Sequence, residues 1–211
     1  MTHKGHPGHR DWDDETTWAK ERLLEPALVP VTEALLDAVR IRPGERLLDL
    51  ACGLGQTAAA ATARGADALG IDLSRNRTAA ARERFPGTRF EAADASTPPA
   101  GPWDAVVCRF GAHHLPEGWA QAIHAVLASG GRLAIAEWPP KDERDEQNGM
   151  RPAGHWQTKL GETGYQEVRV DRVPTRLAGP ARQDPEIKEK LTDFGPGLED
   201  RECLIISAWK R

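Results

Sequence analysis

The sequence has little of what several protein classes need. Its three cysteines, Cys52, Cys108 and Cys203, do not have the spacing of a metal site. No apolar run approaches the roughly 20 residues that a membrane span needs, and the N-terminus lacks the apolar core of a secretory signal. The net charge of −4 argues against a nucleic-acid partner, whose phosphates require a basic face. We therefore expect a cytoplasmic protein with reduced thiols.

The composition instead predicts one globular domain. Charged residues make up 28% and hydrophobic residues 39% of 211 residues, which is enough for one sizeable core. Residues 1–15 are polar and carry His3, His6 and His9, and we expect a flexible arm there without a metal role. Residues 16–211 are expected to form the single domain.

One stretch, residues 47–58, organises the rest of the chain. It begins as a buried-strand pattern, breaks at Gly53 and Gly55, and continues into an alanine-rich helix. Glycines let the backbone come close to a ligand, and a helix start presents free N–H groups. Asp49 at the end of the strand suits a ligand with a cation nearby.

Two further acids follow predicted strands. Asp72 ends a strand over 66–72, about 20 residues past the glycines, where nucleotide-binding α/β folds hold ribose hydroxyls. A carboxylate accepts both hydroxyl hydrogen bonds at once. Asp94 follows a short strand over 88–93. Either acid could instead cap a helix or a loop, although Ser74 already suits the cap after Asp72.

The remaining pattern alternates between strands and helices. An N-terminal helix contains Pro26 and Pro30, so we expect two pieces or a kink. The segment 139–150 is charged and is expected to be irregular. The other predicted strands span 103–110, 132–137, 165–173 and 203–209, and the other predicted helices span 18–40, 58–64, 74–84, 117–129 (closed by Gly130 and Gly131), 156–163 and 184–194.

Two motifs carry a family resemblance. The run Asp49-Leu-Ala-Cys-Gly-Leu-Gly55 resembles the D-x-G/A-C-G-x-G motif of class I S-adenosylmethionine-dependent methyltransferases. The run Arg109-Phe-Gly-Ala-His-His-Leu-Pro116 resembles the R-F-A-x-H-H-L-P segment of the branch that methylates small molecules and quinones. DNA and glutamine methyltransferases carry N-P-P-Y or D-P-P-Y at this point, and this sequence has neither.

The resemblance implies a fold and a cofactor. The fold would be a Rossmann-like α/β fold with a seven-stranded, mostly parallel sheet, helices on both faces, and an antiparallel last strand between the fifth and sixth. Residues 16–40 would form a helical lid, 42–140 the cofactor-binding core, and 141–211 the substrate-side elements and last strands. S-adenosyl-L-methionine would be the cofactor and S-adenosyl-L-homocysteine the product.

The resemblance also assigns site residues. The glycines would make room for the methionyl end of the cofactor, Asp49 would read its ammonium, Asp72 its ribose and Asp94 its adenine amino group. The predicted cofactor-binding residues are Asp49, Ala51, Gly53, Gly55, Gln56, Asp72, Leu73, Asp94, Ala95 and Arg109. The predicted lid or substrate residues are Trp12, Trp18 and His155.

The chemistry requires alignment and, for some acceptors, a base. His113 follows the fourth strand at the open edge, titrates near working pH, and is our first candidate base. Glu137 ends the adjacent strand and could orient the imidazole or bind substrate. His114 is the neighbouring candidate, and both histidines could simply pack. A histidine base favours oxygen or carbon acceptors in a small-molecule substrate.

Two other readings stay open. Residues 53–58 formally match G-x-G-x-x-G/A with Asp72 at a suitable distance, which would suit a nicotinamide-dependent oxidoreductase. That pattern explains neither Asp94 nor the His-His-Leu-Pro run. The second alternative is a methyltransferase fold that binds the cofactor without methylating, or that catalyses another reaction such as a cyclisation.

Overall fold

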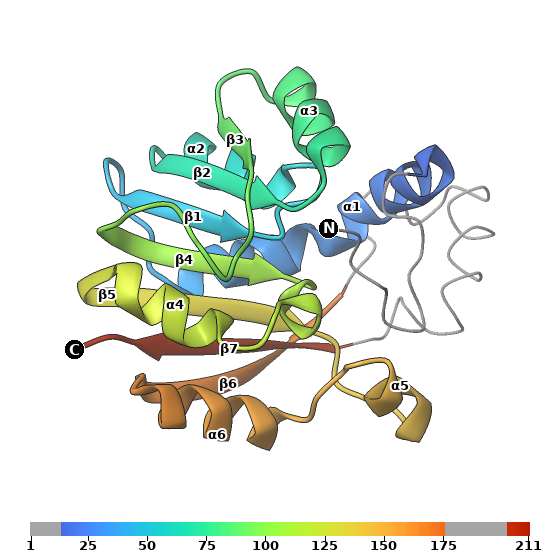
Figure 1. Cartoon of the computed structure of the whole chain (residues 1–211). Helices are drawn as coiled ribbons and strands as arrows, with labels where there is room; N and C mark the ends of the chain where they lie inside the picture. The colour runs from blue at the N-terminus through green and yellow to red at the C-terminus, as the bar shows by residue number, and fades with distance from the viewer. Residues whose placement is uncertain (1–13, 176–201) are drawn as a thin grey trace.

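The computed structural model describes residues 14–175 and 202–211, and these ranges form a seven-stranded sheet flanked by helices (Figure 1). The strands are β1 (Arg46–Leu50), β2 (Asp67–Asp72), β3 (Arg89–Ala92), β4 (Trp103–Arg109), β5 (Leu127–Glu137), β6 (Gln166–Pro174) and β7 (Glu202–Trp209). They lie in the order β3-β2-β1-β4-β5-β7-β6. The first five in this order run parallel, and β7 is antiparallel to β5 and β6. The predicted α/β fold is confirmed.

Helices cover both faces of the sheet because its central strands are apolar on both sides. Adjacent residues of a strand point to opposite faces, yet Leu47, Leu48, Val106 and Val107 are all fully buried. Figure 1 shows α4 and α6 in front of the sheet and α1 and α2 behind it. The helices are α1 (Glu15–Ala38), α2 (Gln56–Ala63), α3 (Arg75–Arg84), α4 (Trp119–Val126), α5 (Glu143–Gln147) and α6 (Ala153–Thr163).

Each face has its own hydrophobic cluster. Leu35 of α1, Ala58 of α2 and Ala81 of α3 share a cluster with inward-facing residues of the sheet. Trp119 of α4 and Trp156 of α6 belong to the cluster on the opposite face. In the described part of the chain, no helix combines the length and apolar character needed to cross a bilayer.

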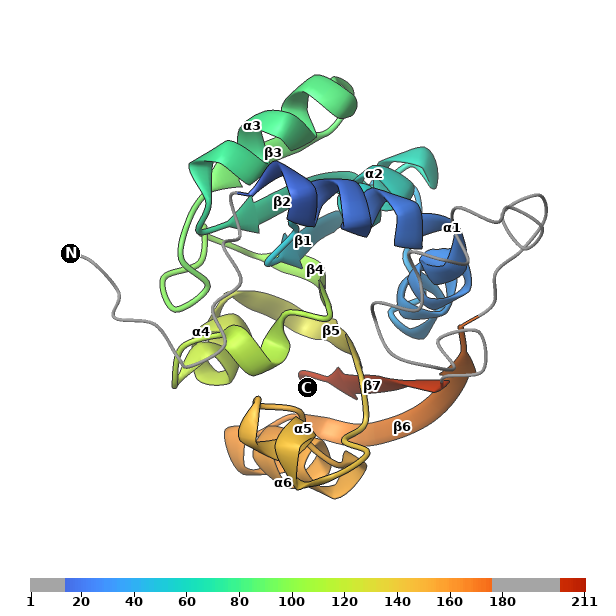
Figure 2. The same cartoon turned by 90° about the vertical axis from the view of Figure 1, so that its right-hand side faces the viewer.

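The carboxyl ends of the parallel strands meet at one edge, which Figure 2 presents to the viewer. The chain order reverses between β1 and β4, since β2 and β3 lie on one side of β1 and β5 lies beyond β4. Ligands of open α/β sheets bind at such a reversal, outside the carboxyl ends of the strands. The first part of α1 reaches the same edge (Figure 1). The fold therefore predicts a ligand site at this edge, next to β1 and β4.

Helix α1 continues through both of its prolines. Pro26 and Pro30 lie inside the 24-residue helix and provide no N–H, so the carbonyls four residues earlier lose their helical donor. Figure 2 shows the helix axis change direction along its length. The structure thus agrees with the expected kink, and the helix begins at Glu15 rather than at Trp18.

The prediction that Gly130 and Gly131 close a helix over 117–129 is wrong. Helix α4 ends at Val126, and the chain enters β5 directly. The Lys210 ammonium stabilises this early exit by donating to the Leu127 carbonyl at 2.8 Å. The two glycines lie within the strand, where their backbone exchanges hydrogen bonds with Lys210.

The segment after β5 is also more regular than its charge pattern suggested. It contains α5, whose first turn is capped by Asp142, because the carboxylate accepts a hydrogen bond from the Asp145 N–H at 3.0 Å. The expectation of irregular structure throughout 139–150 is therefore wrong. The helix predicted over 184–194 lies outside the described residues.

Gly55 allows β1 to turn into α2 against Phe90. Its backbone has a φ of +89°, and an added Cβ would lie 2.7 Å from the Phe90 ring. We expect Gly55→Ala to lower the free energy of unfolding by about 2–4 kcal/mol, through left-handed strain and overpacking. Urea denaturation would measure this effect.

Gly154→Ala is the matched control, because Gly154 lies in α6 and an added Cβ meets nothing within 4 Å. This variant should be neutral or stabilise by up to about 1 kcal/mol, since alanine favours a helix. Equal losses in the two variants would contradict the packing explanation.

Candidate active site

The turn from β1 to α2 is a tight loop with left-handed backbone at three positions. Ala51, Gly53 and Gly55 have φ values of 49°, 55° and 89°. The Cys52 N–H donates to the Ile71 carbonyl of β2, and the Gly55 N–H donates to the Cys52 carbonyl, both at 2.9 Å. Ala51 is strained because its Cβ disfavours this conformation, and such strain tends to occur at functional sites.

The Asp72 carboxylate links this turn to the start of α3. Its Oδ2 accepts from the Gly53 N–H at 3.0 Å, and its Oδ1 accepts from the Ser74 N–H at 2.9 Å. Ser74 caps α3, because its hydroxyl accepts from the Arg77 N–H at 3.0 Å. Each carboxylate oxygen has a further lone pair, so Asp72 retains acceptor capacity for a ligand. The cap arrangement and the predicted ribose contact are therefore compatible.

Asp49 is enclosed beneath the same turn. It is 1% exposed, and its Oδ2 accepts from the Ala58 N–H of α2 at 3.1 Å. Burial raises the pKa of Asp49 to about 7, although the positive charge of Arg109 and the Ala58 N–H both lower it. The group is consequently poised between its two protonation states near neutral pH. A cation placed beside it would favour the carboxylate.

The other residues predicted to contact the cofactor differ in accessibility. Asp94 Oδ1 accepts from both the N–H and the hydroxyl of Ser96, each at 2.8 Å, which is a loop cap. Ala95 is buried in the core, whereas Leu73 is 59% exposed. Gln56 begins α2, and its amide nitrogen is buried with no hydrogen-bond partner among the described residues. A buried donor of this kind suits an acceptor atom of a ligand.

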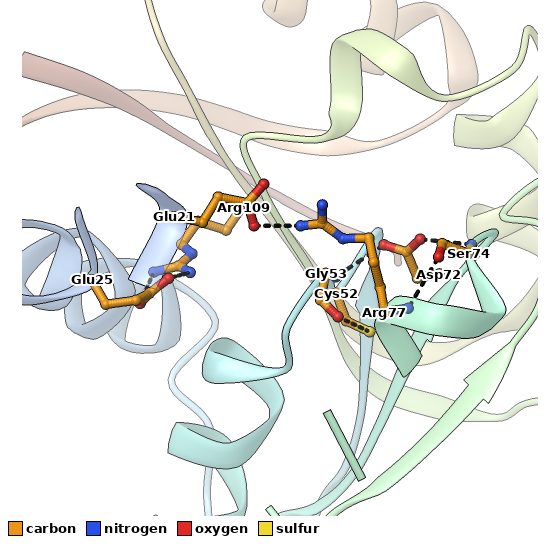
Figure 3. A network of polar contacts seen from close by, with 8 residues as sticks. All are labelled: Glu21, Glu25, Cys52, Gly53, Asp72, Ser74, Arg77 and Arg109. Carbon is orange, nitrogen blue, oxygen red and sulfur yellow. Dashed lines mark hydrogen bonds and ion pairs between the residues drawn. The ribbon is translucent and has the colours of Figure 1, made fainter. Parts of the chain in front are cut away.

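Two ion pairs attach α1 to the carboxyl edge (Figure 3). Glu25 binds Arg109 through both oxygens, at 2.7 and 3.1 Å, and Thr32 accepts from Arg109 at 2.9 Å. Glu21 binds Arg77 at 2.5 Å. Glu21 and Glu25 lie one helical turn apart and so share a face of α1. Arg109, predicted from the sequence to bind cofactor, thus holds α1 against β4.

Sequence reasoning missed Glu21, Glu25 and Arg77. The partners are separated by 56 and 84 residues, and an acid–base pair at such distances has no local pattern. No signal in the sequence marks these residues. In the structure Arg77 is 5% exposed, and arginine is seldom so buried without a partner.

The structure brings together His113 and Glu137. His113 lies in the middle of the short 3₁₀ turn Ala112–His114 after β4, and Glu137 ends β5 with 1% exposure. The imidazole Nδ1 lies 2.9 and 3.0 Å from the two carboxylate oxygens, and the backbone N–H of His113 donates to Oε1 at 3.2 Å. An ionised carboxylate only accepts, so Nδ1 carries the proton. In the neutral ring, Nε2 is then the basic nitrogen.

Of the other candidate residues, His114 neighbours this pair, whereas His155 and Trp18 lie on α6 and α1. His114 is exposed, and its ring centre lies 3.8 Å from that of His113 at a tilt of 48°. His155 is exposed on α6, and no hydrogen bond joins it to that pair in the described ranges. Trp18 lies near the start of α1 and is half-buried. Trp12 and the three histidines of the predicted arm lie outside the described residues.

Two aromatic rings stack at the ends of β4 and β5. Phe110 and Trp138 have ring centres 4.6 Å apart and planes within 7°. Phe110 has a φ of +58°, and its N–H donates to the Ala136 carbonyl at 2.8 Å. Both rings pack against the hydrophobic cluster that α1 and α2 share with the sheet.

Comparisons with known proteins show which family the chain resembles. Residues 47–131 match a family described as a methyltransferase domain. A demethylmenaquinone methyltransferase of Beutenbergia cavernae is 39% identical over 113 residues, which cover 51% of this chain and 47% of that protein. The 27-O-demethylrifamycin SV methyltransferase of Amycolatopsis mediterranei is 34% identical over 141 residues, which cover 62% of this chain and 50% of that protein. This chain spans about half the length of these curated relatives.

A solved structure gives the same fold. The phosphoethanolamine N-methyltransferase 2 of Haemonchus contortus, in complex with S-adenosyl-L-methionine, superposes with a TM-score of 0.73. The match covers 98% of this chain and 61% of that chain at 19% identity, which shows the fold alone. The matched methyltransferase domain over residues 47–131, the curated relatives and the sheet order together support a class I S-adenosylmethionine-dependent methyltransferase.

The raised pKa of Asp49 predicts how stability depends on pH. Because the folded state favours the protonated acid, this group contributes its full stability below its ordinary pKa of 3.8 and loses it as pH rises through about 7. Relative to Asp49→Asn, the wild-type protein should lose about 1.4 kcal/mol per pH unit within that window. Urea titrations between pH 4 and 8 test this, and parallel curves for the two proteins would contradict it.

Proposed function

We propose that this chain transfers a methyl group from S-adenosyl-L-methionine to a small organic acceptor, at an oxygen or carbon atom. The observation that carries the proposal is the His113–Glu137 pair at the same sheet edge as the glycine turn and Asp72. That edge combines groups suited to a nucleoside with a base beside them. When bound, the cofactor supplies a methyl group on a positively charged sulfur.

The residues of the turn suit this cofactor. Asp72 would accept the ribose hydroxyls with its remaining lone pairs, and the unpartnered Gln56 amide would donate to an acceptor atom. Asp94 would accept from the adenine amino group, with Leu73 and Ala95 at the ring. Asp49 would face the ammonium, which would favour its ionised form. Gly53 and Ala51 would leave space for the methionyl end.

His113 would handle the proton of the acceptor. Its Nε2 would accept a proton from an acceptor O–H or acidic C–H as the new bond to carbon forms. Glu137 keeps Nδ1 protonated, fixes the ring, and would stabilise the imidazolium that results. Alignment of acceptor and methyl group would supply the rest, because orientation alone can lower a barrier by about 7–11 kcal/mol.

An apolar organic acceptor suits the surroundings of this pair. Phe110 and Trp138 stack at the ends of the same two strands that carry the pair. The two curated relatives are named for methylation of demethylmenaquinone and of a rifamycin, both organic small molecules. We therefore propose a small molecule as the partner of this site.

The cofactor can be tested first. Calorimetric titration should detect binding of S-adenosylmethionine and S-adenosylhomocysteine, and no binding of NAD. Asp72→Ala should weaken S-adenosylhomocysteine binding by at least about 10-fold, because hydrogen bonds to a charged group are worth roughly 1.5–3 kcal/mol. Asp67→Ala is the matched control, since Asp67 lies exposed at the other end of β2. Tight NAD binding, or intact affinity in Asp72→Ala, would refute these assignments.

The base can be tested through turnover with an acceptor found by screening hydroxylated aromatic and quinone compounds. His113→Ala should reduce kcat about 100-fold or more, while S-adenosylhomocysteine affinity stays within a few-fold. Glu137→Gln should also slow turnover, because the amide orients but does not stabilise the imidazolium. His124→Ala, near the end of α4, serves as the control. Unchanged turnover in His113→Ala would leave alignment as the mechanism.

A further inference from the structure

Arg77 lies against the glycine turn although it belongs to α3. A Cβ added to Gly53 would lie 2.8 Å from Arg77 Nη2, so the guanidinium contacts the turn at a position that only glycine leaves open. The Arg77 side chain is 7% exposed. Figure 3 shows it extending from α3 past Gly53 toward α1. A buried positive charge therefore stands at the part of the turn that the Asp72 carboxylate also reaches.

Glu21 provides the anion that this charge requires. Its Oε2 lies 2.5 Å from Arg77 Nη2, and its side chain is 31% exposed, far more than that of Arg77. Glu21 thus reaches Arg77 from α1 through a partly exposed side chain. The Arg77 side chain is enclosed, and its backbone N–H takes part in the Ser74 cap of α3. Glu25 and Arg109 hold α1 one turn further along, with exposures of only 17% and 12%. Release of Glu21 alone would therefore leave α1 attached.

The proposed cofactor carries an anion of the same kind. Its amino-acid end bears a carboxylate, the only negative charge on a molecule that also has an ammonium and a sulfonium. A guanidinium binds a carboxylate through paired N–H donors, so the carboxylate of a ligand could replace that of Glu21 without leaving Arg77 buried and unpaired. One carboxylate would replace another, so the net charge beside the Arg77 guanidinium would stay the same.

We propose that Arg77 binds the carboxylate of the cofactor's amino-acid end, and that Glu21 occupies this position until the cofactor replaces it. This inference rests on the proposed function. It makes Arg77 a specificity-determining residue, since it distinguishes the cofactor from a form that lacks the carboxylate. Glu21 is then a competitor of the ligand rather than a contact of it.

Binding measurements with two ligands test the proposal. S-adenosylmethionine and decarboxylated S-adenosylmethionine differ only in the carboxylate. Calorimetry should show that the wild-type protein prefers the first by about 10-fold or more, in line with one charged hydrogen-bonded contact. Arg77→Met should bring that ratio close to one while affinity for the decarboxylated form stays within about three-fold. Glu21→Gln should tighten S-adenosylmethionine binding by a few-fold, because a competing anion is gone.

Controls separate this role from a structural one. Arg75→Met, on the exposed side of α3, should leave the ratio of the two affinities unchanged. Circular dichroism would establish that each variant folds, and Arg77→Lys, which keeps the charge but loses the paired donors, should give an intermediate ratio if Arg77→Met does not fold. A preserved wild-type ratio in either Arg77 variant overturns the proposal.

The same titrations distinguish failure here from failure of the proposed function. If the wild-type protein binds neither ligand, the proposed function fails. If it binds both without preference, the proposed function stands and the role of Arg77 is refuted. A loss of affinity for both ligands to the same extent in Arg77→Met would assign the residue to folding of the turn.

Discussion

The turn between β1 and α2 is the constraint on which the site depends. The chain must leave a strand buried on both faces and begin a helix within a few residues, while packing against Phe90. Left-handed backbone at Ala51, Gly53 and Gly55 makes this reversal possible. The amide groups of the turn and of α2 are then satisfied by Asp72 and Asp49. These two acids are therefore part of the scaffold before any ligand arrives.

Asp72 and Asp49 can each support the turn and still contact a ligand. Each carboxylate oxygen of Asp72 accepts one hydrogen bond, Oδ2 from Gly53 and Oδ1 from Ser74, and keeps a second lone pair for a ligand. Burial raises the pKa of Asp49 to about 7, and a neighbouring cation would lower that pKa again. A positively charged ligand beside Asp49 would therefore stabilise the ionised carboxylate that burial disfavours.

The N-terminal helix gives the edge its second wall. Its kinked course brings Glu21 and Glu25, which share one face, over two arginines. Arg77 belongs to α3 and Arg109 to β4. Buried or half-buried pairs of this kind contribute more to specific positioning than to stability, because desolvation offsets much of their attraction. At the ends of β4 and β5, His113 meets Glu137, and Phe110 stacks on Trp138 against the cluster on the α1 face of the sheet. One edge therefore gathers the glycine turn with Asp72, the His113–Glu137 pair and the aromatic stack.

Local pattern accounted for most of the fold. The buried strands, the glycine turn, the Ser74 cap and the position of the last strand could all be predicted, because each depends on neighbouring residues or on a resemblance carried by a short motif. At the end of α4, where the local signal misled, a distant contact stabilises the observed structure. The Lys210 side chain ends α4 early, so that Gly130 and Gly131 join a strand instead of closing a helix.

The sequence by itself determined the α/β class, the turn, and the residue types gathered after each parallel strand, because periodicity and glycine are local properties. It also nominated His113 as a candidate base and Glu137 as a residue that could orient it. Only the tertiary structure decided that their side chains meet, since β4 and β5 become neighbours through sheet pairing. The same holds for Arg77 and Glu21, and for Arg109 and Glu25. These contacts join residues 56 and 84 positions apart, and pairing at such distances follows from packing α1 across the finished sheet.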